Sequence, residues 1–517
     1  MDVARRVADG PEQFFGAAQP HPVFAIRWRC DLRPGLCVGG DRRHGGKKQG
    51  NSDDDFLHGC LSDSLSPRIL AGFYQEKRSV QSRDARDRIA VGLPNNVVIV
   101  GGGIAGLAAS IYLARGGRTV TLFEKRRYLG GRAVTHLRHG YRFNLGPHAF
   151  YRGGEGSKVL AELGIPVRGG VPKQSGIALY HDERHRLPTG LWSLWATGLL
   201  TAADKWEASK LLLRIRRLKK ASQFGGISVR QWLDRNVART RVRETLEALL
   251  RVATYCNEME KLNAGAALNQ LRLVMRGVIY VDEGWQKIVD ALHSSAVAAG
   301  VNFITSSRVV RVDHDGAVQA IEIGGLESES QTETQSYLRP LPGDSRGTRL
   351  AADTVLLAVD PATARDLIGE VSWPPMTPVL LSTLDVALSR LPQPKKTFAI
   401  GIDRPLYYSV HSRWAQLTPK GGALIHVSRY GGGDQAELEA LLDEMQPQWR
   451  DAVVHCRFLP SMTVSNALVP PAPAARPAAV TPIRGLFLAG DWVGDVGLLS
   501  DAALASARDS AKAMLAG

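Results

Sequence analysis

The sequence predicts an α/β fold that opens on a parallel strand-helix-strand unit, and three observations carry this prediction. Asn96–Val100 is a short apolar, β-branched run of the kind that forms a buried parallel strand. A glycine-rich turn and a stretch with helical spacing of apolar residues follow it. The run "TVTLF" then indicates a second strand, which ends at Glu124. Elements in this order are typical of a dinucleotide-binding domain.

Three glycines in the turn have the spacing G-x-G-x-x-G. Gly101 would make the tight turn, Gly103 would let the backbone approach a pyrophosphate, and Gly106 would let the helix pack close to the strand. The phosphates would lie at the helix N-terminus, where free N–H groups and the helix dipole favour anions. Glu124 can accept hydrogen bonds from ribose hydroxyls. This pattern alone fits either FAD or a nicotinamide dinucleotide.

Length and composition exclude several classes of protein. A chain of 517 residues is too long for one core and indicates two or three domains. The net charge of +15 is spread along the chain, which argues against nucleic acid as a partner. Five scattered cysteines without a C-x-x-C pair favour a reducing cytoplasm over a disulfide framework. No apolar run reaches the roughly 18 residues of a membrane span.

Residues 1–93 lack helical or strand periodicity, so we expect a disordered leader there. Three cysteines, with His44 and His58, fall in this segment, but their spacing matches no zinc pattern. We therefore expect no metal site. The Ser- and Glu-rich segment 326–347 is expected to be a long solvated loop.

The segment "RRYLGGRAVTHLRHGYRFNLGPHAF" distinguishes between the dinucleotides. With its glycine doublet, Gly130 and Gly131, followed by Arg132, it resembles the FAD-dependent superfamily of amine oxidases, protoporphyrinogen oxidases and phytoene desaturases. The resemblance is nearest to the phytoene desaturase-like members. It implies FAD in a Rossmann-type, GR2-like domain, with Arg132 adding charge-assisted hydrogen bonds at the pyrophosphate. We expect the FAD to be bound non-covalently, because the residues around Cys456 do not resemble the covalent attachment sequence of some relatives. Lys125 to Arg127 leave a nicotinamide 2′-phosphate as the competing interpretation.

The C-terminal segment "IRGLFLAGDWVGDVGLLSDAALASARDSAKAMLAG" resembles the final motif of the same superfamily. The pattern predicts a strand, then Gly490 and Asp491, then a closing helix from about Ser500. The resemblance implies that Asp491 contacts the ribityl or phosphate region. It places Ser500, Asp501, Ala502 and Ala503 at the pyrimidine side, where the positive end of the helix would stabilise an anionic reduced flavin.

Two further segments complete the expected cofactor site. The strand pair around Val309 resembles the one that contacts adenine, and the loop after Asn144 is expected near the flavin ring. His148 in that loop is the candidate for a polar catalytic role, with a structural histidine bound to backbone as the alternative. The expected FAD-binding residues are Gly101, Gly103, Ile104, Ala105, Gly106, Glu124, Lys125, Gly130, Gly131, Arg132, Gly146, Pro147, His148, Val309, Gly490, Asp491, Ser500 and Ala502.

The resemblance also implies two interleaved parts. The FAD-binding domain would comprise residues 94–155, 277–370 and 481–517, and an α+β substrate domain would comprise 156–276 and 371–480. The first insertion has largely helical spacing, whereas "PLYYSV" and "GALIHVSRY" in the second are typical of antiparallel strands.

Three functions fit the sequence. The leading expectation is an FAD-dependent desaturase or dehydrogenase that removes hydride from an apolar, isoprenoid- or carotenoid-like substrate, with oxygen or a quinone as electron acceptor. It is favoured because the final motif offers Trp492 rather than the aromatic pair that cages an amine. An amine oxidase or protoporphyrinogen oxidase is the alternative enzyme, and a non-catalytic flavin-containing binding protein is the third interpretation.

Residues 191–220 combine tryptophans and leucines with a basic cluster. This composition is typical of a helix at a membrane surface. The competing interpretation is that the aromatic residues line the substrate cavity and the basic run is a solvated face. We therefore expect a cytoplasmic protein, with peripheral membrane contact through this segment as the open alternative.

Overall fold

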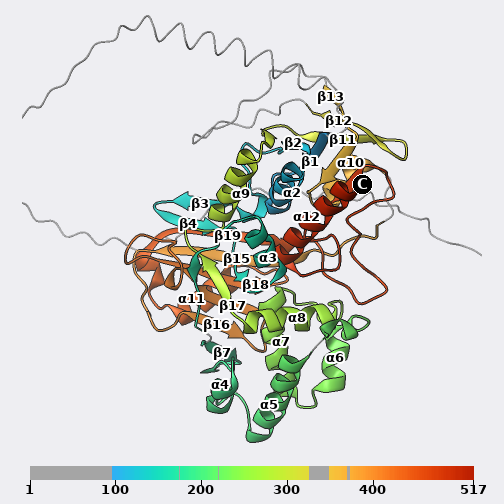
Figure 1. Cartoon of the computed structure of the whole chain (residues 1–517). Coiled ribbons are helices and arrows are strands. Elements are labelled where there is room, and N and C mark those ends of the chain that lie inside the picture. The colour runs from blue at the N-terminus through green and yellow to red at the C-terminus, as the bar shows by residue number, and fades with distance from the viewer. Residues whose placement is uncertain (1–95, 174, 219, 325–347, 370–372) are drawn as a thin grey trace, which may run out of the picture.

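The computed structural model describes residues 96–173, 175–218, 220–324, 348–369 and 373–517 (Figure 1). The expected leader, residues 1–93, and the expected loop at 326–347 lie outside the described residues. Among the described helices, none combines the length and the apolar character needed to cross a membrane.

A five-stranded parallel sheet forms the first layer, and its strands come from distant parts of the chain. Each strand is short and apolar, as expected for strands buried on both faces. The order is β10 (Asn302–Ile304), β2 (Thr119–Phe123), β1 (Asn96–Val100), β14 (Thr354–Leu357) and β20 (Leu486–Leu488). The predicted α/β fold is confirmed.

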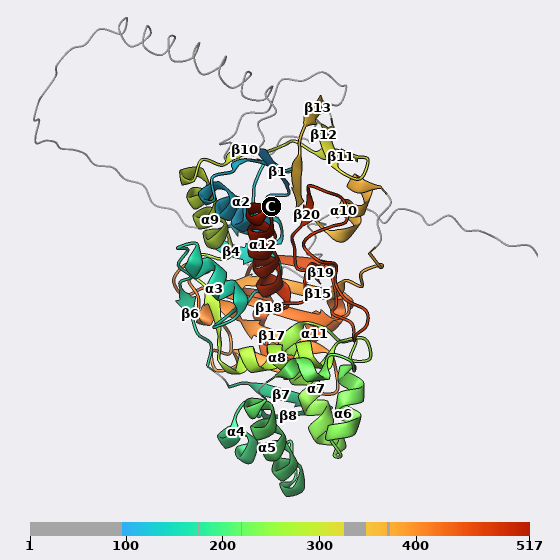
Figure 2. The ribbon, with the colours of Figure 1, turned by 45° about the vertical axis from the view of Figure 1, so that its right-hand side comes forward.

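Helices cover one face of this sheet, and a small antiparallel sheet with a helix covers the other (Figures 1 and 2). The first face buries α2 (Ile104–Arg115), α9 (Gln286–Ala298) and α12 (Leu499–Ala516) in one apolar core. The second face carries β11 (Val309–His314), β12 (Val318–Ile323), β13 (Thr348–Ala351) and α10 (Pro361–Ile368). The first and last helices of the described chain, α2 and α12, therefore pack side by side.

A seven-stranded sheet forms the second large layer. Its neighbouring strands are antiparallel except for β16 and β7. The order is β19 (Val453–Ser465), β15 (Val379–Leu388), β18 (Ala423–Tyr430), β17 (Leu406–Val410), β16 (Phe398–Gly401), β7 (Ile177–Tyr180) and β8 (Glu183–Arg186). The strands predicted from "PLYYSV" and "GALIHVSRY" are present as β17 and β18.

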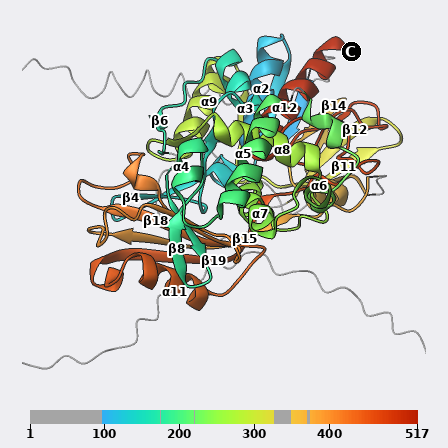
Figure 3. The same ribbon diagram turned by 90° about the horizontal axis from the view of Figure 1, so that it is seen from below.

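The two faces of the seven-stranded sheet have different neighbours. Helix α11 (Gln435–Met445) packs on one face in an apolar core (Figure 3). Because side chains alternate along a strand, Thr383 and Asp385 of β15 lie on the opposite face. That face meets the hairpin of β3 (Thr135–Arg138) and β4 (Tyr141–Asn144).

Short elements and helices complete the described chain. Helix α3 (Glu155–Glu162) packs on α12, and β9 (Val278–Val281) pairs with both β5 (Phe150–Tyr151) and β6 (Gly169–Gly170). A helical region extends beyond the seven-stranded sheet, with α4 and α5 at its tip (Figures 1 and 2). It comprises α4 (Leu191–Ala196), α5 (Ala202–Arg217), α6 (Val229–Asn236), α7 (Thr240–Thr254) and α8 (Ala264–Met275).

The packing of α2 on β1 requires a glycine at position 106. A Cβ atom there would lie 2.0 Å from the carbonyl oxygen of Gly101, closer than any real contact. We predict that Gly106→Ala destabilises the protein by at least about 1–3 kcal/mol, because the backbone itself would have to move. Thermal unfolding measures the loss. The control is Gly226→Ala, whose Cβ would meet no atom within 4 Å; equal midpoints for the two variants would contradict the close packing.

Candidate functional site

The glycine turn after β1 leaves the N-terminus of α2 open. Gly101 has φ +109°, which favours glycine, and Gly103 precedes the first helical residue. No side chain caps this end, and the first turn of α2 contains no acidic residue. A Cβ at Gly103 would meet no atom within 4 Å. The first-turn N–H groups, including those of Ile104 and Ala105, are therefore suited to bind an anion such as a phosphate.

Glu124 lies beside this turn, at the end of β2. Its carboxylate is nearly buried and accepts hydrogen bonds from the Gly102 N–H at 2.7 Å and the Arg126 N–H at 2.9 Å. Each oxygen retains a lone pair for a further donor, such as a ribose hydroxyl. The Ser307 N–H donates to the Glu124 carbonyl at 3.1 Å, which brings the start of β11 at Val309 close to this acid. Lys125 is exposed.

The glycine doublet is joined to the glycine turn through its backbone. The Gly130 N–H donates to the Gly102 carbonyl at 2.8 Å, and Gly130 has φ +119°. Arg132 then reaches the C-terminal motif: its Nη2 lies 2.9 Å from Asp491 Oδ2, and its Nη1 donates to the Val464 carbonyl at 2.8 Å. The structure therefore brings together the two motifs that the sequence places far apart.

Asp491 is buried and held as an anion. Burial would raise its pKa, but the charge of Arg132 and hydrogen bonds from Asn466 lower it below its ordinary value. Asn466 donates from its N–H and its side-chain amide, each at 2.9 Å. Arg476 donates to the Asp491 carbonyl at 2.8 Å and to the Gly497 carbonyl at 3.1 Å, which fixes the loop before α12.

Helix α12 begins at Leu499, one residue before the predicted start, so Ser500, Asp501 and Ala502 form its first turn. Asp501 is buried; its Oδ1 accepts from the Gly156 N–H at 2.8 Å, and its Oδ2 has no hydrogen-bond partner among the described residues. Burial raises the pKa of Asp501 to about 6, although the bond from Gly156 opposes this rise. Gly490, at the end of β20, donates from its N–H to Ser506 of α12 at 2.9 Å.

Asn144 fastens the loop that follows β4. Its side-chain oxygen accepts hydrogen bonds from Thr135 Oγ1 at 2.7 Å and from the Trp285 N–H at 3.0 Å. Asn144 therefore links β3, β4 and the start of α9. Later in the loop, a Cβ at Gly146 would lie 2.7 Å from Met462, and Pro147 is buried.

His148 belongs to the same loop and bonds to its backbone. Its Nδ1 lies 3.2 Å from the Gly146 carbonyl, and its ring meets Trp285 edge-on at 5.2 Å between centroids. Burial lowers the pKa of His148 to about 4, so the ring is neutral at pH 7. This geometry favours the structural interpretation of His148 over a catalytic one.

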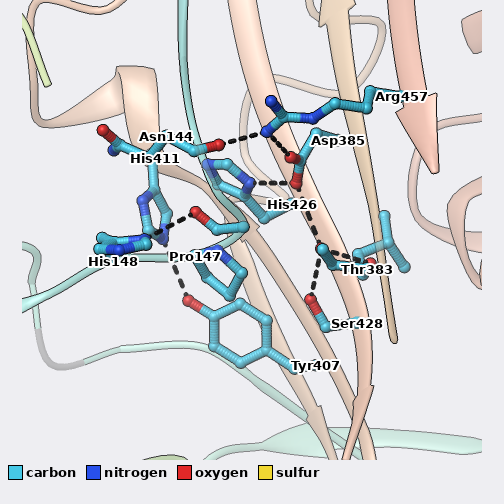
Figure 4. A network of polar contacts seen from close by, with 12 residues as sticks. Asn144, Pro147, His148, Thr383, Asp385, Tyr407, His411, His426, Ser428 and Arg457 are labelled. Atoms are coloured by element: carbon cyan, nitrogen blue, oxygen red, sulfur yellow. Dashed lines mark hydrogen bonds and ion pairs between the residues drawn. The ribbon is translucent and has the colours of Figure 1, made fainter. Parts of the chain in front are cut away.

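A buried set of polar side chains on the seven-stranded sheet was not predicted from the sequence (Figure 4). We call it the polar sheet cluster. It lies on the sheet face opposite α11, against the loop of His148, and every member is buried. Its members are Thr383, Asp385, Tyr407, His411, His426, Ser428 and Arg457.

Asp385 organises this cluster. Its carboxylate accepts a hydrogen bond from His426 Nδ1 at 2.6 Å and pairs with Arg457, which also donates to the Asn144 carbonyl. Burial alone would raise the pKa of Asp385, yet His426 and Arg457 lower it to about 2. The paired charges thus fasten the His148 loop to the seven-stranded sheet. A charged residue inside the apolar run "VLLSTLDVAL" is the sequence signal that would have indicated this cluster.

Buried tyrosines, one of which is Tyr407 of the cluster, line this region and present neutral hydroxyl groups. Tyr255 donates to the Pro147 carbonyl at 3.3 Å, and Tyr407 lies 3.2 Å from His411 Nε2. Burial raises the pKa of each tyrosine above its ordinary value, so all remain protonated at pH 7. The tyrosines are Tyr151, Tyr255, Tyr280, Tyr407 and Tyr430.

Within the described part of the chain, no group of three or more His, Cys, Asp or Glu side chains is arranged to hold a metal ion. The open N-terminus of α2 and the acid after β2 lie at the carboxyl end of the parallel sheet, where dinucleotide-binding proteins hold their ligands. The fold is that of the class of dinucleotide-binding proteins.

The profile of the family described as flavin containing amine oxidoreductase matches residues 104–515. The chain therefore belongs to this family. Membership identifies it as a flavin-containing oxidoreductase.

Curated relatives are similar to parts of the chain. Phytoene desaturase of Cercospora nicotianae is 30% identical over 166 residues, which are 30% of this chain and 24% of that protein. The putative flavin-containing monoamine oxidase AofH of Mycobacterium tuberculosis is 28% identical over 257 residues, 43% of this chain and 52% of that one. The chain thus spans between a quarter and about half of the length of these two relatives.

Solved structures share the fold over nearly the whole of their own length. An oxidoreductase from Methanosarcina mazei has a TM-score of 0.61 at 17% identity, covering 81% of this chain and 100% of that one. A putative protoporphyrinogen oxidase from Exiguobacterium sp. 255-15 has a TM-score of 0.59 at 16% identity, covering 82% and 99%. At these identities the likeness shows the fold alone.

The raised pKa of Asp501 predicts a pH-dependent penalty on stability. Because the pKa in the folded state, about 6, exceeds the ordinary value of 3.8, the favourable contribution of the protonated acid is complete below about pH 4 and lost as the pH rises through 6. We predict that Asp501→Asn raises stability over the wild type by at most about 3 kcal/mol at pH 7.5 and by much less at pH 4.5. Thermal unfolding at both pH values measures the difference.

The control for this prediction is Asp509→Asn, which removes an exposed carboxylate from the same helix. It should change stability little at either pH. A stability difference between Asp501→Asn and the wild type that is the same at both pH values would contradict the assignment.

Proposed function

We propose that this flavoprotein oxidoreductase removes hydride from an apolar, isoprenoid- or carotenoid-like substrate, as a desaturase or dehydrogenase. The observation that carries this proposal is the position of the side chain of Trp492, the aromatic residue of the final motif. Its indole N–H donates to the Val359 carbonyl at 2.8 Å, and its ring lies 5.5 Å from that of Trp373 in the apolar core. Trp492 is fully buried there and takes no part in a cage for an amine.

The charges of the polar sheet cluster support the same preference. An ammonium group is stabilised by a carboxylate that has no other cation. Asp385, the carboxylate of the cluster, is already paired with Arg457 and His426, and the surrounding phenols are neutral. A substrate without a positive charge therefore fits this environment better.

We propose that FAD is bound without a covalent link by the expected residues. The N-terminus of α2 would hold the pyrophosphate, Glu124 the ribose and Asp491 the ribityl region, and the first turn of α12 would lie beside the pyrimidine. When bound, FAD supplies a hydride acceptor. The residues of the chain would then hold the substrate, exclude water and stabilise negative charge through the positive end of α12.

We propose that the two expected parts divide this work. Residues 94–155, 277–370 and 481–517 would hold the cofactor, since the parallel sheet and its covering helices come from them. Residues 156–276 and 371–480 would hold the substrate, since they supply the seven-stranded sheet. The two parts are in contact: α3 packs on α12, and the hairpin of β3 and β4 meets the seven-stranded sheet.

The names of the relatives support both this proposal and its alternative. Two relatives are named phytoene desaturases, one from Cercospora nicotianae and one from Neurospora crassa. Others are named as a monoamine oxidase and a coproporphyrinogen III oxidase. An amine or porphyrinogen oxidase is therefore the second candidate, and a non-catalytic flavin protein is the third.

Anaerobic reduction of the FAD-loaded protein tests the substrate class. We expect an acyclic isoprenoid polyene such as phytoene to bleach the oxidised flavin absorbance, and putrescine to leave it unchanged. Bleaching by putrescine, with peroxide released in air, would favour the amine alternative. Bleaching by dithionite alone would favour the non-catalytic interpretation.

We also propose that α4 and α5 contact an anionic membrane surface. A lipophilic substrate and a quinone acceptor would be available in such a membrane. Trp192, Trp195 and Trp206 are 78%, 51% and 59% exposed at one end of the molecule (Figures 1 and 2). On α5 the spacing places Lys210 and Arg214 on the same face as Trp206. Exposed indoles beside cations match the interface of an anionic bilayer.

Vesicle co-sedimentation tests this contact. We predict that replacing Trp192, Trp195 and Trp206 together by Ser lowers binding to phosphatidylglycerol-containing vesicles about tenfold, because three interfacial anchors are lost. The control replaces Leu137, Val297 and Val310 by Ser, since these apolar residues are also exposed but lie elsewhere. Equal sedimentation of the two variants, or none of the wild type, would rule the contact out.

A further inference from the structure

We propose that a groove between α3, β5 and β9 binds an anionic amphiphile, a molecule with a carboxylate or phosphate at one end of an apolar chain. The inference goes beyond the proposed function, because the residues that line this groove belong neither to the expected FAD site nor to the polar sheet cluster. The groove was not expected from the sequence.

The groove has the size and the lining of a small-molecule site. Its volume is about 570 Å³, and such sites in proteins commonly measure about 300–1,000 Å³. Pro166 is exposed, and Val167 and Ile279 are half-buried, so a bound hydrocarbon chain would remove apolar surface from water. The apolar residues that line the groove are Phe150, Leu160, Ile165, Pro166, Val167 and Ile279.

Two arginines lie together at this groove. Arg152 lines it, and the Arg152 N–H donates to the Gly277 carbonyl at 3.2 Å, next to Arg276. A Cβ at Gly277 would lie 3.9 Å from Arg152 Nη1, and a Cβ at Gly153 would lie 3.7 Å from Arg276 Nη1. Both guanidinium groups therefore lie over the same short stretch of paired backbone.

No described residue neutralises the two arginines. Both are exposed, and neither side chain has a hydrogen bond or an ion pair within the described part of the chain. The acids of the adjacent helix α3 are paired elsewhere: Arg508 Nη1 of α12 lies 3.1 Å from Glu155 Oε2 and 3.8 Å from Glu162 Oε1. Two neighbouring like charges repel each other, and a bound anion would relieve this repulsion.

The chemistry of the groove selects both ends of a ligand. A guanidinium group presents its N–H donors in a planar arrangement that matches a carboxylate or a phosphate. The apolar lining next to Arg152 suits a hydrocarbon chain. An alcohol brings no charge to the arginines, and an ammonium group is repelled by them. An apolar chain with an anionic end therefore fits the groove best.

The position of the groove indicates where such a ligand comes from. Figures 1 and 2 both show α3 well away from α4 and α5, the helices that we propose at the membrane. A lipid that stays in the bilayer contacted by those helices would not reach the groove. We therefore assign the groove to an amphiphile taken up from solution.

Calorimetric titration of the FAD-loaded protein tests this proposal. The probes are decanoate, decyl phosphate, decanol and decylamine, which share a ten-carbon chain and are titrated below the concentrations at which they form micelles. We expect each anion to bind at least tenfold more tightly than decanol or decylamine, which is about 1.4 kcal/mol. Arg152→Ala should reduce this preference to within about threefold. The control Arg235→Ala removes the same charge from an exposed position on α6 and should keep the preference.

Ala161→Trp is a second variant that leaves every charge in place. Ala161 is exposed and lines the groove, so a larger side chain there should occupy the space of the hydrocarbon chain. We expect decanoate to bind at least tenfold more weakly, with vesicle sedimentation and flavin absorbance unchanged.

Three results of these titrations would overturn the proposal. They are equal binding of decanoate and decanol by the wild type, an unchanged preference in Arg152→Ala, and an unchanged decanoate affinity in Ala161→Trp. A loss of vesicle sedimentation in Ala161→Trp would overturn the assignment to an amphiphile from solution and indicate a lipid of the bilayer. The flavin absorbance of the same samples reports cofactor loading separately, so a failure of the proposed cofactor site is recognised independently.

Discussion

The ion pair between Arg132 and Asp491 is the contact on which the arrangement of the site depends. It joins the segment after the second parallel strand to the segment before the last helix, at 2.9 Å and with Asp491 buried. Arg132 itself is partly exposed, so the main effect of the pair is to give the buried charge of Asp491 a cationic partner. Asn466 and Arg476 hold Asp491 and its loop from the other side, so the start of α12 is set relative to the glycine turn.

The polar sheet cluster connects the loop of His148 to the second layer, the seven-stranded sheet. Arg457 bonds to both Asp385 and the Asn144 carbonyl, so a strand of the seven-stranded sheet holds the loop that leads to His148. Within the cluster, His411 Nδ1, His426 Nε2 and Arg457 Nε are the buried side-chain atoms without a hydrogen-bond partner among the described residues. The neutral phenol groups of the buried tyrosines surround the rings of His411 and His426 and hold them in place.

Local pattern was enough to predict the parallel unit, the glycine turn, Glu124 and the start of α12, because each depends on neighbours in sequence. The tasks of Asp385, His411 and His426 could not be predicted in this way. Each lies in or next to an apolar strand, and its partners come from other strands that only the sheet order brings close. For the same reason, the hydrogen bond between Asn144 and the Trp285 N–H could not be predicted from the sequence. The ligand contacts of the expected site remain predictions.

The central claim is that one FAD site is assembled from segments at both ends of the described chain. The most direct measurement is the visible absorption of the purified protein after addition of FAD and removal of free cofactor, for the wild type, Glu124→Ala and Glu260→Ala. Glu260 is an exposed surface acid and serves as the control. We predict visible flavin absorbance, with about one FAD per chain, in the wild type and Glu260→Ala, and at least tenfold weaker retention in Glu124→Ala. A wild-type protein that stays colourless, or equal retention in all three, would contradict it.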